Sequence, residues 1–159
     1  MTTVLGATFT ASVRKHFGDL FAQYELREVG AQDNLNFAAV VVKSSRYYLR
    51  LTCDFRDRWI EVGLGRLSEG MVPPIPIAPP HTPEQVRELP SAIVVWLGTA
   101  DKEGAFALGT YPEETQESLD LTVQRLAEAY QKSARRLLEG DEQEWRRAAE
   151  LAISRVWSA

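Results

Sequence analysis

The chain has 159 residues, 45% of them hydrophobic, and its 18 basic and 22 acidic side chains give a net charge of -4. This length supports one domain with a substantial core and is short for two. The acidic balance argues against nucleic acid or a membrane surface as the main partner. The charge is uneven, however, because residues 43–66 carry a net charge of +3 and residues 67–120 a net charge of -7.

The cysteine content and the apolar runs exclude several further classes. Cys53 is the one cysteine, so neither an intrachain disulfide nor a cysteine-rich zinc site can form. No apolar run approaches the roughly 20 residues that a membrane-spanning helix needs. The first residues place their basic side chains after the apolar ones, unlike a secretory signal. These features predict a soluble, cytoplasmic protein without a cofactor.

The N-terminal part predicts a helix within residues 1–22, followed by a sheet within residues 23–67. Apolar side chains recur at helical spacing over residues 8–22, namely Phe9, Val13, Phe17, Leu20 and Phe21. Tyr24, Leu26 and Val29 then indicate a first strand. The turn-like sequence of residues 30–34 is expected to end it.

Residues 35–67 carry the clearest pattern of the chain, an antiparallel β-meander. Residues 35–43 are apolar and β-branched, and residues 46–54 and 58–67 alternate between apolar and polar side chains. Short polar turns separate these runs. The sequence therefore predicts three consecutive strands, which with the first strand make a four-stranded sheet.

The alternation assigns each side chain of the middle strand to one face of the sheet. The inner, core-forming face is predicted to carry Tyr47, Leu49, Leu51 and Cys53. The outer face is predicted to carry Arg46, Tyr48, Arg50, Thr52 and Asp54, and to be either solvent-exposed or covered by the C-terminal helices.

The rest of the chain is predicted to be a proline-rich crossing over residues 68–83, and then mainly helical over residues 84–159. A helix is expected to start at the Thr82 cap and end near Pro90. Residues 92–97 fit either a short helix or a buried fifth strand, because periodicity does not separate the two. Residues 99–109 are interpreted as a loop.

From Pro112 onward the pattern is helical, with a stop at Gly140 and a new helix capped by Asp141. The apolar stripe of this last helix is predicted to include Trp145, Val156 and Trp157. Two helices joined by so short a turn are expected to form a hairpin. The predicted fold is thus one α+β domain, with an N-terminal helix, an antiparallel meander of four or five strands, and a C-terminal helical hairpin packed on the sheet.

Residue types that carry chemistry are present without the spacing that chemistry needs. His16 and His81 lie far from each other and from any metal-ligating partner. Gly63 and Gly65 lack the third glycine and the following helix of a nucleotide loop, and they indicate instead either a bulge or a place where something packs closely on the sheet.

The paired carboxylates have structural explanations as well. Asp54 and Asp57 bracket a predicted turn, where aspartate bonds to nearby backbone amides. Glu113 and Glu114 open a predicted helix, where acidic groups suit the helix dipole. We therefore predict no catalytic, cofactor-binding or metal-binding residues, and expect that the protein is not an enzyme.

The remaining candidates are surface residues suited to binding another protein. Arginine, tyrosine and tryptophan are enriched where binding energy concentrates at interfaces. Such residues gather on the outer face and turn of the meander, and we predict as partner-binding residues Arg46, Tyr48, Arg50, Asp54, Arg56, Arg58 and Trp59.

The segment YLRLTCDFRDRWIEVGLG, with the preceding helix and strands, resembles small bacterial proteins of unassigned function, some of which are immunity proteins encoded beside polymorphic toxins. The resemblance covers residues 9–67. It implies inhibition by binding, in which a stable acidic domain blocks a toxin and contributes no catalytic residues.

The functional expectation is a protein-binding domain of immunity type, whose acidic residues 67–120 meet a basic partner. One alternative is an adaptor or secretion chaperone that forms a homodimer around an exposed apolar groove. Another is a small-molecule-binding domain or enzyme with a pocket between the sheet and the C-terminal helices.

Overall fold

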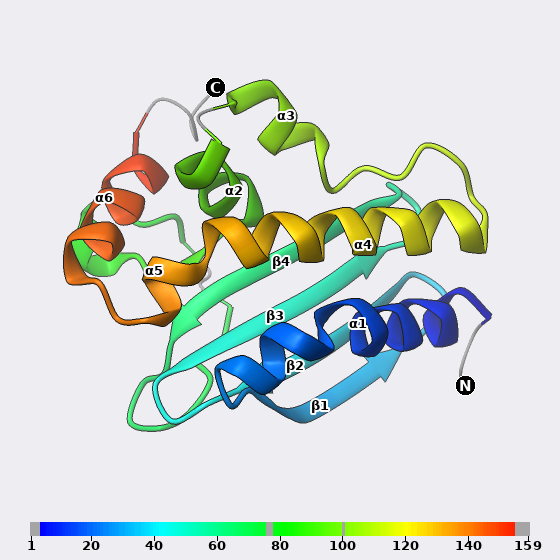
Figure 1. Ribbon diagram of the computed structural model, residues 1–159, viewed down its shortest axis with the longest axis horizontal. Coiled ribbons are helices and arrows are strands. Elements are labelled where there is room, and N and C mark those ends of the chain that lie inside the picture. Colours follow the sequence, from blue (N-terminus) through cyan, green and yellow to red (C-terminus); the bar gives the residue numbers. More distant parts are fainter. Residues whose placement is uncertain (1–3, 76–77, 100, 155–159) are drawn as a thin grey trace.

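A five-stranded antiparallel sheet forms the centre of the structure, with helices against one face (Figure 1). The structure is a computed structural model, and it describes residues 4–75, 78–99 and 101–154. The strands follow one another in the order β1-β2-β3-β4-β5. An N-terminal helix, the sheet and C-terminal helices give the α+β fold that the sequence predicts.

Helix α1 (Val4–Gln23) begins four residues before the predicted helix. The predicted stripe faces inward, because Phe9, Val13 and Phe17 are buried together with Leu20. The helix lies on the sheet next to α4 (Figure 1).

The strands of the meander are β2 (Phe37–Lys43), β3 (Tyr47–Asp54) and β4 (Trp59–Arg66), as predicted to within two residues. Strand β1 (Arg27–Asp33) differs from the prediction, because it runs through residues that were expected to form a turn. Its pairing with β2 shifts between Glu28 and Gly30, so a bulge at Val29 lets the strand continue.

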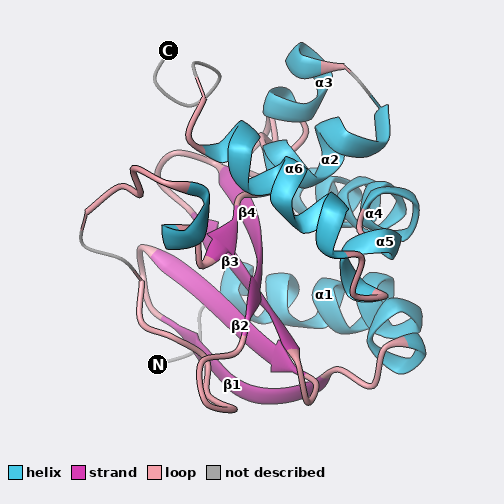
Figure 2. Cartoon of the chain, turned by 90° about the vertical axis from the view of Figure 1, so that its left-hand side faces the viewer, coloured by secondary structure: helices cyan, strands magenta, loops and turns pink. Residues whose placement is uncertain are grey.

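The two faces of β3 differ in burial. Leu49, Leu51 and Cys53 are completely buried on the face below the helices, as predicted. The prediction of a solvent-exposed outer face is wrong for Tyr48, which is 1% exposed. Figure 2 shows the reason, since the segment between β4 and α2 (Ser91–Thr99) passes over that side of the sheet.

The proline-rich segment is attached to the outer face through backbone carbonyls. Lys43 Nζ donates to the carbonyl of Gly70 at 3.1 Å, and Arg50 Nη2 donates to the carbonyl of Pro73 at 2.8 Å. A polar cover of this kind suits a segment whose prolines have no N–H to donate to a strand.

The helix expected between Thr82 and Pro90 does not form. A 3-10 helix, η1 (Pro83–Gln85), is followed by the two-residue strand β5 (Glu88–Leu89), which pairs with β4. The predicted start is nevertheless present, because the Gln85 side chain accepts a hydrogen bond from the Thr82 N–H at 3.2 Å.

Helix α2 resolves the alternative at residues 92–97 in favour of a helix. The following segment was expected to be a loop, but it contains the short helix α3 (Lys102–Ala107). Asp101 caps α3 by accepting a hydrogen bond from the Gly104 N–H at 3.0 Å. An aspartate at this position is a local signal for the start of a helix, and the prediction of a loop did not take it into account.

The C-terminal part contains α4 (Gln116–Ser133), α5 (Arg135–Leu138) and α6 (Glu142–Ala152). Helix α4 covers the sheet, whereas α6 contacts α2 and places Trp145 in a stack on Tyr47 of β3 with 5.6 Å between ring centroids. Asp141 caps α6 as predicted, at 3.1 Å from the Glu144 N–H. Val156 and Trp157 lie outside the described residues.

Candidate partner-binding surface

The seven predicted binding residues lie in three places. Arg46 is exposed beside the start of β3, whereas Asp54 ends that strand. Eight residues at about 3.3 Å each separate the two positions by roughly 25 Å. Tyr48 and Arg50 lie between them on the covered part of the outer face. One patch therefore does not contain all seven residues.

Tyr48 and Arg50 hold the chain's own segments in place. Both donate to Oε1 of Glu88 in β5, from the Tyr48 hydroxyl at 2.8 Å and from Arg50 Nε at 3.1 Å. Burial and the adjacent Glu88 carboxylate raise the pKa of Tyr48 well above its usual value. These contacts attach β5 and the proline-rich segment to the sheet, and they leave Tyr48 inaccessible to a partner.

Two glycines of β4, which have no side chains, leave the space that this network occupies. A side chain at Gly65 would overlap the Tyr48 ring, and one at Gly63 would overlap the Glu88 carboxylate. The sequence prediction that something packs closely on these glycines is confirmed.

The turn between β3 and β4 presents the other residues of the predicted set. Asp54 Oδ1 accepts from the backbone N–H of Arg56 at 2.9 Å and of Asp57 at 3.0 Å, which is the turn chemistry that the sequence indicates. Arg58 adopts a left-handed φ of 51° and donates from Nη1 to the Pro112 carbonyl at 3.0 Å. The turn is thus fixed while Arg56, Asp57 and Arg58 remain exposed.

Trp59 is half-buried at the edge of the same turn. Its indole N–H donates to Glu61 at 3.2 Å. The other Glu61 oxygen accepts from the backbone N–H and the hydroxyl of Ser91 at 2.6 Å each. Trp59 is therefore tied to the start of α2 and contributes only part of its ring to the surface.

Three chain segments meet around this turn. The Phe55 N–H donates to the Asn36 carbonyl of the β1–β2 turn at 2.9 Å. The Tyr111 N–H donates to the Arg58 carbonyl at 3.1 Å, which brings the segment before α4 alongside. We call the resulting surface, made of residues 34–36, 54–59 and 112–117, the hairpin end.

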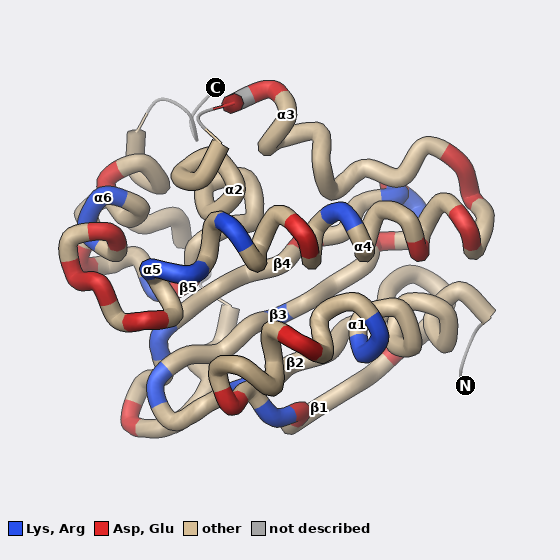
Figure 3. The backbone as a smooth tube through the Cα atoms, viewed as in Figure 1, with Lys and Arg blue, Asp and Glu red and all other residues tan. Residues whose placement is uncertain are grey.

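The hairpin end combines an apolar tip with an excess of acidic groups. Leu35 is 80% exposed. The surface carries two arginines, Arg56 and Arg58, against five carboxylates, Asp54, Asp57, Glu113, Glu114 and Glu117. Figure 3 shows acidic positions at the beginning of α4. The hairpin end is therefore a net negative surface.

The acidic segment 67–120 as a whole does not form one surface. Glu84 pairs with Arg146 of α6 at 2.9 Å, and Glu88 pairs with Arg50 at 3.1 Å. Both lie away from the hairpin end. Only the last part of the segment contributes acidic groups to the hairpin end.

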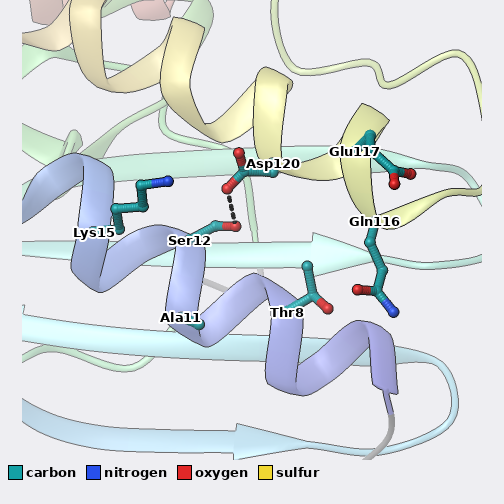
Figure 4. A pocket seen from close by; sticks show the side chains of 7 residues that line it. All are labelled: Thr8, Ala11, Ser12, Lys15, Gln116, Glu117 and Asp120. Carbon is teal, nitrogen blue, oxygen red and sulfur yellow. Dashed lines mark hydrogen bonds between the residues drawn. The ribbon is translucent and has the colours of Figure 1, made fainter.

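A shallow groove of about 390 Å³ lies between α1 and α4, and a serine and an aspartate form part of its lining (Figure 4). The Ser12 hydroxyl donates to Oδ1 of Asp120 at 2.6 Å, and His16 Nε2 lies 3.0 Å from the same oxygen. The Ser12 hydrogen bond, with a smaller contribution from His16, lowers the pKa of Asp120.

This arrangement joins two helices and does not activate a nucleophile. Nucleophilic catalysis needs the serine bonded to the base and the base bonded to the acid. Here Ser12 and His16 both bond to Asp120 itself. More than 100 positions separate Asp120 from its partners, so the sequence contained no local signal for the cluster.

A second groove, of about 530 Å³, lies between α6, η1 and the end of β4. Trp145 forms part of its lining, and Arg66 stacks over that ring at 4.4 Å. Two ion pairs connect its walls, Arg66 with Glu142 at 3.1 Å and Arg146 with Glu84 at 2.9 Å. Four of its five charged groups are therefore paired with one another, and Arg87 is the fifth.

Comparison with known protein families, with curated protein sequences and with solved structures finds no match to this chain. None of the helices that the structure describes is long and apolar enough to cross a membrane. Within the same residues, no group of three or more histidine, cysteine, aspartate or glutamate side chains is placed to hold a metal ion.

Proposed function

We propose that this chain is a non-catalytic protein-binding domain that uses the hairpin end to bind a basic surface of another protein. The observation that carries the proposal is the meeting of three segments distant in sequence. They bring exposed arginines, an exposed leucine and an excess of carboxylates together on one rigid turn.

The acidic groups of the hairpin end are available to a partner. Glu113, Glu114 and Glu117 are exposed, and their carboxylates form no ion pair within the residues that the structure describes. Clustered charges of one sign accelerate the encounter with an oppositely charged protein. Leu35 and Arg56 project from the same surface and are suited to anchor the bound state.

The most specific form of the proposal is an immunity-type inhibitor of a toxin in a bacterial cytoplasm. It rests on the resemblance of residues 9–67 and on the acidic hairpin end. Toxins that act on nucleic acid need basic surfaces, because phosphates dominate the binding energy. An acidic protein that covers such a surface inhibits by occlusion and needs no catalytic group.

No particular observation favours the alternative functions. A homodimer around an apolar groove needs contiguous apolar surface. The described large apolar side chains that are exposed lie on five different parts of the chain, with Met71 and Ile75 sharing the proline-rich segment, and they are Val4, Val29, Leu35, Met71, Ile75 and Leu121. A small-molecule site in the groove beside α6 would have to displace the ion pairs that connect its walls.

The proposal is tested first by affinity capture of the tagged protein from its native lysate at low salt, with mass spectrometry of the bound proteins. A stoichiometric basic partner supports the proposal. Its association rate should then fall several-fold as salt rises from 50 to 300 mM, because salt screens the attraction. An association rate independent of salt contradicts the acidic interface.

Charge-reversal variants locate the interface. Glu113→Lys, Glu114→Lys and Glu117→Lys together should slow association at least tenfold. The matched control is Glu25→Lys, Glu69→Lys and Glu128→Lys, which changes the net charge equally at exposed positions elsewhere. Equal slowing by both triple variants would assign the effect to overall charge and overturn the proposed surface.

A further inference from the structure

A basic pocket lies where four helices meet, at the end of the molecule remote from the hairpin end. The ends of α2 and α4, helix α5 and helix α6 enclose a hollow of about 450 Å³. We call it the helix-junction pocket. Its charged lining consists of Lys132, Arg135, Arg136, Arg147 and Glu144. Figure 3 shows the basic positions of α5 and the end of α4 beside α6.

The charge of this pocket is opposite to that of the whole chain. Four cationic side chains face one carboxylate, although the chain carries a net charge of -4. Arg135 has a partner of its own, Glu139, at 3.3 Å on the next helical turn. Among the residues described by the structure, the side chains of Lys132, Arg136 and Arg147 donate no hydrogen bond, and the two arginines share the one carboxylate of Glu144. Three cations beside one carboxylate leave an excess of two positive charges for a ligand.

Glu144 positions two of these cations. Its side chain is buried, with the residue 8% exposed, and its oxygens lie 3.6 Å from Arg136 and 3.7 Å from Arg147. Both distances exceed a good hydrogen bond. The carboxylate thus draws the two guanidinium groups toward each other from α5 and α6 without using their N–H donors.

Helix dipoles account for only part of this charge. A cation in the last turn of a helix interacts favourably with the carbonyl end of that helix, and Lys132 in the last turn of α4 fits this role. Arg147 lies in the middle of α6, away from the partial charges at the helix ends, so the helix dipole does not stabilise its positive charge. The excess of cations therefore needs a different explanation.

We propose that the helix-junction pocket binds a small molecule that carries phosphate groups. Guanidinium groups match phosphate oxygens with paired N–H donors, and a phosphate group supplies negative charge for the two positive charges that Glu139 and Glu144 leave unbalanced. The volume falls within the range of small-molecule sites. The pocket is lined mainly by polar groups, and its four cations extend from α4, α5 and α6, so the helices determine where each side chain starts. This site is separate from the hairpin end.

The test is calorimetric titration of the full chain with inorganic pyrophosphate at 100 mM salt. The wild type is expected to bind, and the double variant Arg136→Gln/Arg147→Gln is expected to weaken binding at least tenfold. Arg146→Gln is the matched control, because Arg146 adjoins Arg147 in α6 but lines the other groove. Glu144→Gln is expected to strengthen binding, since it removes the carboxylate that competes for both arginines.

Several outcomes would overturn this site. No binding of pyrophosphate to the wild type would do so. Equal weakening by Arg146→Gln would show nonspecific attraction, and equally tight binding of a tricarboxylate would remove the preference for phosphate. Arg136 and Arg147 are mostly exposed, with side chains 71% and 63% accessible, so their substitution removes little packing. Because the buried Glu144 carboxylate loses both partners, the double variant should melt at a lower temperature, and binding is compared where wild type and variant are both folded.

Discussion

The two faces of the sheet are stabilised in different ways. The inner face of β3 carries apolar side chains that are completely buried below α1 and α4, and the Tyr130 hydroxyl of α4 donates to the Val62 carbonyl. The outer face carries Tyr48 and Arg50, which are joined to Glu88 under the proline-rich segment. One face depends on buried apolar area, and the other on a few polar contacts.

This difference explains where a partner can bind. The polar network covers the middle of the outer face with the chain's own residues 70–75 and 88–89. The inner face is covered by helices. The hairpin end projects beyond both covers, so its side chains are free to meet another protein while the faces maintain the fold.

Among the variants that test the difference between the two faces, Leu51→Ala on the inner face is expected to lower the stability most. Leu51 is 0% exposed, so the variant loses apolar burial and leaves a cavity. The free energy of unfolding should fall by about 2–5 kcal/mol in urea denaturation. Thr52→Ala on the other face of the same strand is the control, with an expected loss below about 1 kcal/mol. Similar losses at both positions would abolish the distinction between the faces.

The next effect concerns the close packing on β4. Gly65→Ala should destabilise the fold by about 1–3 kcal/mol, because the added methyl group overlaps the Tyr48 ring. Gly63→Ala is the companion variant, and it should cost less because the end of the Glu88 side chain can move aside. Thermal and urea denaturation give both values. A stabilised Gly65→Ala protein would show that the ring does not rest on the backbone.

The sequence predicted the meander well because its signals are local. Alternation along β3 and β4, of eight residues each, determines both strand and face, and the inner face of Leu49, Leu51 and Cys53 follows directly. Strand β5 contains two residues, which is too short for any period to appear. The burial of Tyr48 depends on Glu88, 40 residues away, so no local pattern indicated it.

The candidate surface was predicted only in part, because contacts between residues distant in sequence form it. Alternation grouped residues by the face of one strand, but the length of β3 separates Arg46 from the turn, and the network covers Tyr48 and Arg50. Tertiary contacts bring Leu35 and Glu113 to the turn instead. Composition had revealed an acidic segment, yet only the fold shows which of its carboxylates share a surface with Arg56.

A smaller effect is expected when the outer network loses its charge. Glu88→Gln keeps the shape of the side chain but removes the charge that faces Arg50 and the Tyr48 hydroxyl. The pair is partly solvated, so the loss should be about 1 kcal/mol in urea denaturation. Glu150→Gln, at an exposed pair within α6, is the control and should change stability by less than half as much. If Glu88→Gln leaves the free energy of unfolding unchanged, the charge of Glu88 does not contribute to stability and the network stabilises the fold through packing alone.

The smallest effect is expected on the inner face and concerns the thiol of Cys53 in β3. Cys53 is buried, and burial raises the pKa of its thiol to about 12 from a usual value of 9.0. In the unfolded chain the thiol ionises near pH 9, whereas in the folded chain it stays protonated until about pH 12. Ionisation therefore favours the unfolded chain, and stability falls as pH rises through this interval.

Cys53→Ala separates this effect from the buried tyrosines, which also resist ionisation. The wild type should lose about 0.4 kcal/mol more than Cys53→Ala between pH 8 and pH 9, because the variant lacks the thiol but keeps every tyrosine. Urea denaturation at the two pH values measures the difference, and slow labelling of native Cys53 by a thiol reagent should accompany it. Parallel losses in the two proteins would place the thiol in contact with water, and would contradict the dry inner face on which the comparison rests.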